Sequence, residues 1–228
     1  MPIPDALNEV GNVFGLKAFV EVLMNTVITI SRQFGSGGRL IGKLLADKLG
    51  IPFYDKEIII KAAEKSGLAT GFIEENEQKR KSFYAYPVPP ARWGVTPSSF
   101  DSFEAKIYAA EAEAIENCAK SGSCVIVGRC ADYVLKGKAN CINIFVYADE
   151  EDRIKRVMEV YGDAPTAKKA QKLIREKDRQ RARHYRYYTD NEWGKSTEYD
   201  VCVNSATIGI DNCVEMLASM YKSVTAKQ

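Results

Sequence analysis

Short apolar runs and amphipathic segments take turns along most of this chain. The apolar runs, typical of buried strands, cover residues 26–30, 51–55, 123–127, 142–146 and 199–203. Apolar residues at helical spacing predict helices over residues 40–49, 56–66, 101–119, 150–161, 166–188 and 211–223. Because strands and helices alternate, we expect a doubly wound α/β fold, with a parallel sheet covered by helices on both faces.

Two segments fall outside this alternation. Residues 1–23 have apolar positions at roughly helical spacing, which predicts an N-terminal helical extension with Asp5 as its N-cap. The extension is either an extra helix packed on a domain of residues 24–228 or a stretch upstream of a natural start at Met24.

Residues 78–103 contain four prolines and several aromatic residues, which predicts a long loop excursion. Long loops of this kind often act as lids, and this one either closes over a bound base or packs as a surface lid.

Composition and charge narrow the class of protein. The chain has 228 residues, of which 46% are hydrophobic and 27% charged, as in ordinary soluble globular domains. Lysine and arginine (32) nearly balance aspartate and glutamate (30), which argues against a surface coated in positive charge for nucleic acid. No apolar run approaches the roughly 20 residues that span a bilayer, so no membrane partner is expected.

The cysteines do not suggest a metal site. Six cysteines and a single histidine, His184, form no CxxC pair and no ligand-like grouping. A secretory signal is not recognisable, so reduced thiols in a cytoplasmic protein are expected. His184 itself is expected to be a surface residue of a helix rather than a base.

A glycine-rich loop, Gln33-Phe-Gly-Ser-Gly-Gly-Arg39, joins the first strand to the following helix. Glycines let the backbone approach an anion closely, and the helix N-terminus aims N–H groups and a positive dipole end at it. The loop therefore predicts a phosphate site, rather than a glycine turn without a ligand. Its expected binding residues are Gly35, Ser36, Gly37, Gly38, Arg39 and Leu40.

The loop departs from the GxxxxGK[ST] pattern at three positions. Gln33 stands for the first glycine, Arg39 for the lysine and Leu40 for the Ser/Thr that holds magnesium. Arginine can still bind a phosphate, even in a bidentate manner. Leucine cannot bind Mg²⁺, so any metal must be held by the nucleotide and by carboxylates elsewhere, and no protein metal ligand is predicted.

A strongly basic helix lies in the C-terminal half. Residues 168–186 contain nine lysines and arginines but only two acidic residues. Arg175, Arg179 and Arg183 are spaced by four, so they share one helix face and repel one another unless an anion lies between them. This favours a basic lid over residues 166–190 that neutralises a transferring phosphoryl group. The alternatives are a solvated charged face and, as an unlikely third, a nucleic-acid groove with tyrosines for stacking.

Several segments together resemble the cytidylate kinase-like family of P-loop kinases. They are residues 28–42 and 49–56 at the start, residues 125–132, which are similar to the Gly-Arg-Asp segment of bacterial cytidylate kinases, and the basic helix over residues 174–183. The resemblance runs from Met24 to the C-terminus. It implies a nucleoside-monophosphate-kinase-like P-loop fold with lid insertions, in which residues 78–103 form an acceptor-side insertion.

The resemblance also implies an activity. It is ATP-dependent phosphoryl transfer to a small acceptor, most simply a nucleoside monophosphate such as CMP, with ATP and Mg²⁺ as cofactors and nucleotides as partners. A kinase for another small acceptor and a non-enzymatic nucleotide-binding protein are the alternatives.

The resemblance assigns a role to a residue of this chain only where that residue matches one of the family's motif residues. Arg129 matches the arginine that helps hold the acceptor nucleotide, and Asp55 matches the acidic residue that ends the second strand. The aspartate after that arginine is Cys130 here, and Asp132 either takes its place or does not. Lys177 and Asp178 match an Arg-Asp pair of the lid, whose later aspartate and arginine fall on Arg181 and His184.

Two further assignments complete the expected site. Arg39, Arg175, Arg179 and Arg183 are expected to stabilise the transferring group, so they form the catalytic set. Asn204, which follows the last strand, is expected to lie beside the adenine base or else merely to lead towards the final helix.

Overall fold

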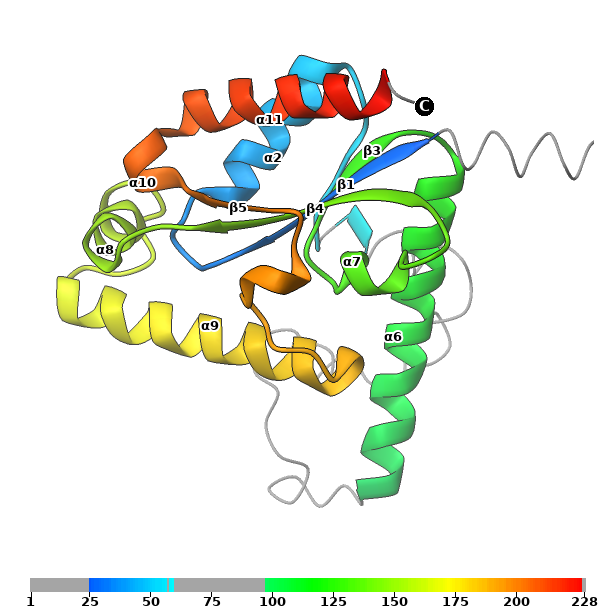
Figure 1. The fold of residues 1–228 in the computed structure, drawn as a ribbon. Coiled ribbons are helices and arrows are strands. Elements are labelled where there is room, and N and C mark those ends of the chain that lie inside the picture. Colours follow the sequence, from blue (N-terminus) through cyan, green and yellow to red (C-terminus); the bar gives the residue numbers. More distant parts are fainter. Residues whose placement is uncertain (1–24, 57, 60–96, 227–228) are drawn as a thin grey trace, which may run out of the picture.

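The computed structural model describes residues 25–56, 58–59 and 97–226. These residues form a parallel sheet with the strand order β2-β3-β1-β4-β5 (Figure 1). The strands are β1 (Thr26–Arg32), β2 (Phe53–Tyr54), β3 (Cys124–Val127), β4 (Asn140–Tyr147) and β5 (Val201–Asn204). The first strand lies in the middle and crossovers go to both sides, which confirms the predicted doubly wound α/β class.

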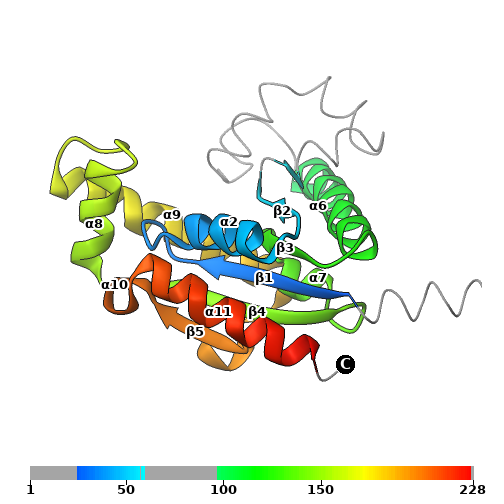
Figure 2. The same cartoon turned by 90° about the horizontal axis from the view of Figure 1, so that it is seen from above.

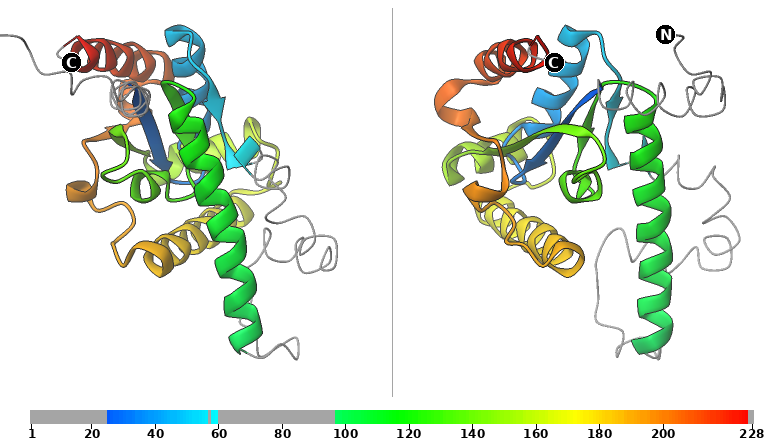
Figure 3. Two further views of the ribbon diagram at one scale, coloured as in Figure 1. Left: turned by 90° about the vertical axis from the view of Figure 1, so that its right-hand side faces the viewer. Right: turned by 45° about the vertical axis from the view of Figure 1, so that its right-hand side comes forward.

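Helices cover both faces of the sheet. They are α2 (Gly38–Leu49), α6 (Pro97–Lys120), α7 (Ala131–Val134), α8 (Glu150–Glu159), α9 (Ala167–Thr189), the 3-10 turn η2 (Ser196–Glu198), α10 (Ser205–Ile208) and α11 (Ile210–Thr225). Helices α2 and α11 pack together on one face, while α7 and α9 lie on the other (Figure 1, Figure 2). Helix α6 contacts β3, the strand next to the β2 edge, and extends well beyond the sheet (Figure 3).

The core has two halves, one on each side of the sheet, because strands buried on both faces present side chains alternately to each. Ile28 and Ile30 of β1 join the cluster beneath α2 and α11, together with Leu45 and Leu217. Val27 points the other way, into the cluster beneath α6 and α7. The sheet is thereby fixed between two helical layers, and the carboxyl ends of β1, β3 and β4 meet at one edge.

The described elements lie within a few residues of the predicted ones. The one-turn helices α7 and α10, which come after β3 and β5, were not predicted. Asp149 is the N-cap of α8, but its side chain accepts no capping hydrogen bond. Helix α6 begins at Pro97, so residues 97–103 are helical rather than part of the loop predicted over residues 78–103. The rest of that loop, most of the 56–66 helix and the 1–23 extension lie outside the described residues.

Two general properties bear on the class of protein. No helix in the described ranges combines the length and apolar character that a bilayer crossing needs. The six cysteines all lie in those ranges, and each is free.

Candidate functional site

The glycine loop lies at the carboxyl edge of the sheet, between β1 and α2. Gly35 and Gly37 have φ values of 82° and 78°, in the left-handed region that favours glycine. Helix α2 begins at Gly38, and no side chain caps its first turn. The backbone N–H groups of Gly38, Arg39 and Leu40 therefore have no carbonyl acceptor four residues earlier in the helix. Such N–H groups at a helix N-terminus are what binds an anion.

Close neighbours explain why the loop is built of glycine. A Cβ atom at Gly35 would lie 2.9 Å from the carbonyl oxygen of Arg153, and one at Gly37 would lie 2.6 Å from Cδ1 of Ile210. At Gly38 a Cβ would lie 2.6 Å from Cβ of Arg32. The loop is therefore enclosed by α8, α11 and the end of β1, and only hydrogen atoms fit at these positions.

Ser36 does not present its hydroxyl to a ligand, in contrast to our expectation. The residue is fully buried, and its Oγ donates to the carbonyl oxygen of Gln33 at 2.9 Å. The Ser205 hydroxyl lies 2.5 Å from the Ser36 carbonyl oxygen and 3.2 Å from that of Tyr147. Ser36 thus stabilises the shape of the loop. The phosphate contacts that remain predicted for the loop are those of its backbone N–H groups.

Asn204 uses its side chain as a helix cap. Its Oδ1 accepts from the backbone N–H groups of Ala206 and Thr207 at 3.0 and 3.4 Å. The residue follows β5 as predicted, but the only role visible for its oxygen is to begin α10. Proximity to an adenine base stays a prediction.

Charged side chains from α8 and α9 hold the first half of the loop. Asp178 Oδ1 accepts from the backbone N–H of Phe34 at 2.7 Å, and its other oxygen pairs with Arg153. Arg153 Nε donates to the carbonyl oxygen of Phe34 at 2.8 Å, and Arg156 donates to that of Gly35 at 2.7 Å. The basic helix is therefore attached directly to the glycine loop.

Arg39 is directed away from the glycine loop. Its Nε and Nη2 atoms both lie on Oδ2 of Asp55, at 2.8 and 2.5 Å. Asp55 follows β2, and its Oδ1 also accepts from the backbone N–H of Ile58. The two residues expected to serve the donor and the acceptor are thus joined to each other.

Arg129 is held in a strained turn directly after β3. Gly128, Arg129 and Cys130 all have positive φ, at 84°, 59° and 54°. For two consecutive non-glycine residues this costs of order 1–3 kcal/mol each. The turn aims Arg129 at Glu111 of α6, with Nη1 and Oε2 3.2 Å apart and the two side chains 10% and 3% exposed. Strain of this kind concentrates at functional sites, which supports the predicted importance of Arg129.

Other cations gather around Arg129. Burial lowers the pKa of Lys56 to about 8, and the charges of Arg129 and Lys177 act in the same direction. Burial also lowers the pKa of Arg32 well below its usual value, with Arg181 and Arg129 as the next causes. Arg181 in turn donates to the carbonyl oxygen of Arg32 at 2.8 Å. We call these five residues the cation cluster: Arg32, Lys56, Arg129, Lys177 and Arg181.

Two buried acceptors border the cation cluster. Oε1 of Glu111 and Nε2 of His184 are buried and have no hydrogen-bond partner among the described residues. Burial raises the pKa of Glu111, while burial and the charges of Arg129 and Lys56 lower that of His184 to about 4. His184 is therefore a half-buried, neutral residue whose Nε2 lies inside the protein, and not the surface residue that was expected.

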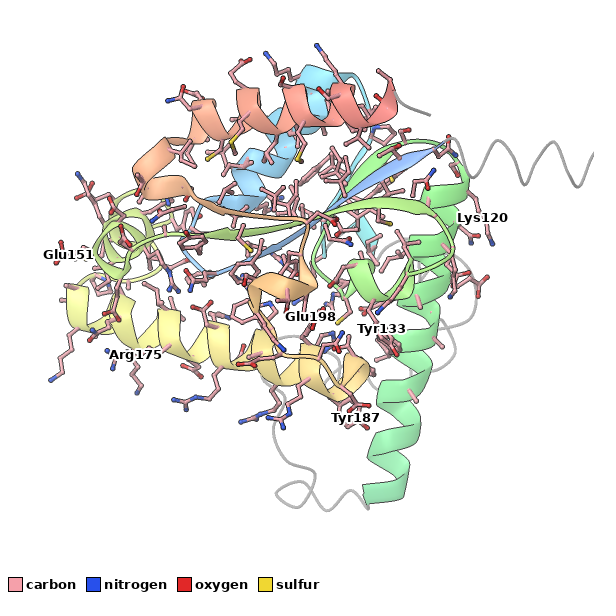
Figure 4. The ribbon with its side chains drawn as sticks, in the orientation of Figure 1. Lys120, Tyr133, Glu151, Arg175, Tyr187 and Glu198 are labelled. Atoms are coloured by element: carbon pink, nitrogen blue, oxygen red, sulfur yellow. The ribbon has the colours of Figure 1, made fainter. Side chains whose placement is uncertain are left out.

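Helix α9 turns the predicted arginines outward. Arg175, Arg179 and Arg183 lie on its exposed side, opposite the buried Tyr185. Arg175 is 62% exposed and lies 3.4 Å from the carboxylate of Glu150 on α8. Figure 4 shows nitrogen-tipped side chains projecting from the side of α9 that faces away from the sheet. The structure does not bring these three arginines to the glycine loop. Asp178 and Arg181 are the residues of α9 that contact Phe34 and Arg32, and Lys177 lies near Lys56.

Asp132 attaches α7 to α9. Its carboxylate accepts a hydrogen bond from the Tyr185 hydroxyl at 2.6 Å, and burial raises its pKa. The predicted contact with an acceptor is therefore replaced, in this structure, by a contact within the protein.

Four residues of the site were not singled out from the sequence. They are Arg32, Lys56, Glu111 and Arg153. Arg32 could have been found from the sequence, because it is a charged residue at the end of a buried β-branched strand. Such a residue has to meet an anion or water at the carboxyl edge of the sheet. Glu111 and Arg153 lie on ordinary amphipathic helices, and nothing local marks them as buried.

The carboxylates do not fit a metal held by the protein. In the part of the chain that the structure describes, no group of three His, Cys, Asp or Glu residues could hold an ion. Asp55 lies beside the glycine loop but is bound by Arg39, and Leu40 offers no side-chain oxygen. Magnesium, where it is required, would have to arrive on the nucleotide.

Comparison with known proteins places the chain. The model of the cytidylate kinase-like family matches residues 27–207. The chain belongs to this family. The protein named Cytidylate kinase from Archaeoglobus fulgidus is 26% identical over 205 residues, which cover 88% of this chain and 96% of the relative. The resemblance found in the sequence is thereby confirmed.

Solved structures agree with the family. An uncharacterized protein from Eubacterium ventriosum is 27% identical with a TM-score of 0.65, over 87% of this chain and 99% of that one. The crystal structure of TT1252 from Thermus thermophilus shares the fold, with a TM-score of 0.53 at 15% identity, over 89% of this chain and 97% of that one. For this cytidylate kinase-like protein, family and fold support kinase activity on a nucleotide or another small molecule.

Proposed function

We propose that this protein transfers the γ-phosphoryl group of ATP to a small anionic acceptor, most simply a nucleoside monophosphate such as CMP. The observation that carries the proposal is the cation cluster, which lies beside the open N-terminus of α2 at the carboxyl edge of the sheet. In doubly wound folds, ligands bind at this edge.

The donor would bind at the glycine loop. The first-turn N–H groups of α2, from Gly38 to Leu40, are oriented towards one point and carry the positive end of the helix dipole. Gly35 and Gly37 let the loop pack closely against Arg153 and Ile210, which fixes its path before that N-terminus. These features supply the phosphate cradle that the modified sequence pattern predicts.

The acceptor would bind between α6, α9 and the strained turn after β3. Arg129 comes from that turn, Lys56 from the end of β2 and Lys177 from α9, so three separate elements contribute positive charge. Burial lowers the pKa of Lys56 most, and the charges of Arg129 and Lys177 lower it further; an acceptor phosphate between these cations would offset both effects. This is the reason for preferring an acceptor that is itself an anion.

The reaction needs no protein nucleophile. An oxygen of the acceptor attacks the γ-phosphorus, the bond to the bridging oxygen breaks, and ADP leaves with that electron pair. The protein contributes positioning and charge neutralisation. We assign neutralisation to the inward residues Lys177 and Arg181 in place of the outward arginines of α9. A cytoplasmic location is part of the proposal, since nucleotide substrates and free thiols both fit it.

The proposal is tested by assaying phosphoryl transfer from ATP, with Mg²⁺, to a panel of acceptors. The panel contains nucleoside monophosphates and other phosphorylated or carboxylated compounds. We expect turnover on at least one nucleoside monophosphate and a loss of about 100-fold or more in Arg129→Gln, because a buried charge contact to the acceptor is removed. Robust transfer only to an acceptor that is not a nucleoside monophosphate would show that the proposed acceptor is wrong, while kinase activity itself would stand. Binding of ATP by calorimetry without turnover on any acceptor would instead identify a nucleotide-binding protein without kinase activity.

A further inference from the structure

Arg32 follows an unusual path across the site. It is the last residue of β1, and its side chain passes over Gly38 and ends against Gly128. A Cβ atom at Gly38 would lie 2.6 Å from Cβ and 3.1 Å from Cγ of Arg32, and one at Gly128 would overlap the Arg32 guanidinium. The lack of a side chain at these two glycines, which belong to separate elements, thus leaves the space that the Arg32 side chain occupies.

The guanidinium of Arg32 has no carboxylate of its own. Within residues 25–56, 58–59 and 97–226, no ion pair or hydrogen bond joins it to an acceptor. The carboxylates of this region are each held by a different arginine, in the pairs Asp55–Arg39, Glu111–Arg129 and Asp178–Arg153. A partly buried cation beside other cations is costly unless an anion joins it. Burial and the charges of Arg181 and Arg129 lower the pKa of Arg32, and the nearby Asp55 carboxylate, which is bound by Arg39, raises it by less.

The location of Arg32 relates the two halves of the proposed site. Gly38 opens α2, where donor phosphates would bind, and Gly128 immediately precedes Arg129 on the acceptor side. The end of the Arg32 side chain therefore lies between donor and acceptor. Arg39, which holds the lysine position of the loop pattern, is bound to Asp55.

We propose that Arg32 binds the phosphoryl group during its transfer and does the work of the missing loop lysine. This inference rests on the proposed kinase function. The planar guanidinium can donate two parallel hydrogen bonds to phosphoryl oxygens and stays protonated throughout, so no proton is exchanged with the substrates. The bond between the γ-phosphorus and ADP breaks as the bond to the acceptor oxygen forms, and Arg32 neutralises the charge on the remaining oxygens.

Kinetics of Arg32→Lys and Arg32→Gln test the assignment, with Arg39→Gln and Arg175→Gln as matched controls. We expect kcat to fall about 100-fold or more in both Arg32 variants and the KM for ATP to rise about tenfold in Arg32→Gln, because the guanidinium contacts the bound phosphates and binds the transferring group more strongly in the transition state. Arg39→Gln should retain more activity than Arg32→Gln. The Arg32→Ala variant should regain activity with added guanidinium ion, which a merely structural role would not produce.

Arg32→Met serves as a second route if these Arg32 variants fold poorly. Its unbranched apolar side chain can still fill the space over Gly38 but carries no charge, and we expect kcat to fall as it does in Arg32→Gln. Retention of more than a third of wild-type kcat in Arg32→Gln, or a larger loss in Arg39→Gln, would overturn the assignment.

Tripolyphosphate binding separates this inference from the proposed function. We expect calorimetry to show at least about tenfold weaker binding in Arg32→Gln and unchanged binding in Arg175→Gln, since only the former contacts the anion. If the wild-type protein transfers no phosphate but shows this difference, the kinase proposal fails and the Arg32 anion site stands. If wild-type transfer occurs and both variants bind and turn over alike, the Arg32 site fails and the kinase proposal stands.

Discussion

Oδ2 of Asp55 accepts hydrogen bonds from both Nε and Nη2 of Arg39, across the gap between the end of β2 and the start of α2. The Arg39 side chain is 65% exposed, whereas that of Asp55 is only 6% exposed. The carboxylate is therefore the member of the pair that depends on its partner, because a buried charge without a counterion is costly.

This asymmetry predicts a compensation between two substitutions. Arg39→Ala should lower the free energy of unfolding by about 1–3 kcal/mol, since it leaves the Asp55 carboxylate buried without that partner. Adding Asp55→Asn removes the charge and keeps an oxygen for the Ile58 N–H, so part of the loss should return. Thermal unfolding of the two single variants and the double variant measures the coupling. Additive effects of the two substitutions would show that the pair contributes nothing.

Local pattern was sufficient to predict the scaffold. The β-branched run before the glycines predicted β1, and the helical spacing after them predicted α2, because both signals depend on neighbouring residues alone. The glycine loop was located for the same reason. Its departure from the usual pattern at Arg39 and Leu40 was likewise visible in the sequence alone.

Side-chain direction could not be predicted in the same way. The four-residue spacing of Arg175, Arg179 and Arg183 correctly places them on one face of α9, but spacing does not say which face meets the sheet. That choice depends on contacts between distant segments, such as Tyr185 with Asp132 and Asp178 with Phe34. The burial of the Ser36 hydroxyl likewise depends on how the loop folds back on itself.

The contact between Arg153 and Asp178 should govern how well the loop is ordered. Arg153→Ala removes the donor to the Phe34 carbonyl and leaves the Asp178 carboxylate largely buried. We expect a loss of about 3 kcal/mol or more in unfolding free energy, with weaker ATP binding, because a buried pair is broken on one side.

Arg175→Ala is the matched control for Arg153→Ala. It breaks the pair with Glu150, whose members are both well exposed, so the expected loss is within about 0.5 kcal/mol. Equal losses in the two variants, measured by urea unfolding, would contradict the view that the inner contact holds the loop.

The outward face of α9 should contribute little to the chemistry. The triple variant Arg175→Gln, Arg179→Gln, Arg183→Gln is expected to keep kcat within about threefold of wild type. Lys177→Gln combined with Arg181→Gln should lose about 100-fold or more, because both residues belong to the cation cluster. Steady-state kinetics with saturating ATP compares the two. A loss of two orders of magnitude in the triple variant would return the arginines to the catalytic role first expected from their spacing.

The buried His184 should make stability depend on pH in a defined window. Its pKa is about 4 in the folded protein, below the usual value of 6.5, because it is buried and faces Arg129 and Lys56 as well as the Tyr188 ring. The unfolded chain therefore takes up a proton first as the pH falls. The stability associated with neutral His184 is complete above about pH 6.5 and is lost progressively between 6.5 and 4, reaching about 2–3 kcal/mol at pH 4.5.

His184→Gln isolates this contribution, since His184 is the only histidine in the chain. Glutamine cannot be protonated in this range, so the fall in unfolding free energy between pH 7 and 4.5 should be about 2 kcal/mol smaller in the variant than in wild type. Carboxylate titration affects both proteins alike and cancels in the comparison. Parallel pH profiles would mean that His184 is already protonated, or solvated, in the folded state, and the unpartnered Nε2 atom would then need a different explanation.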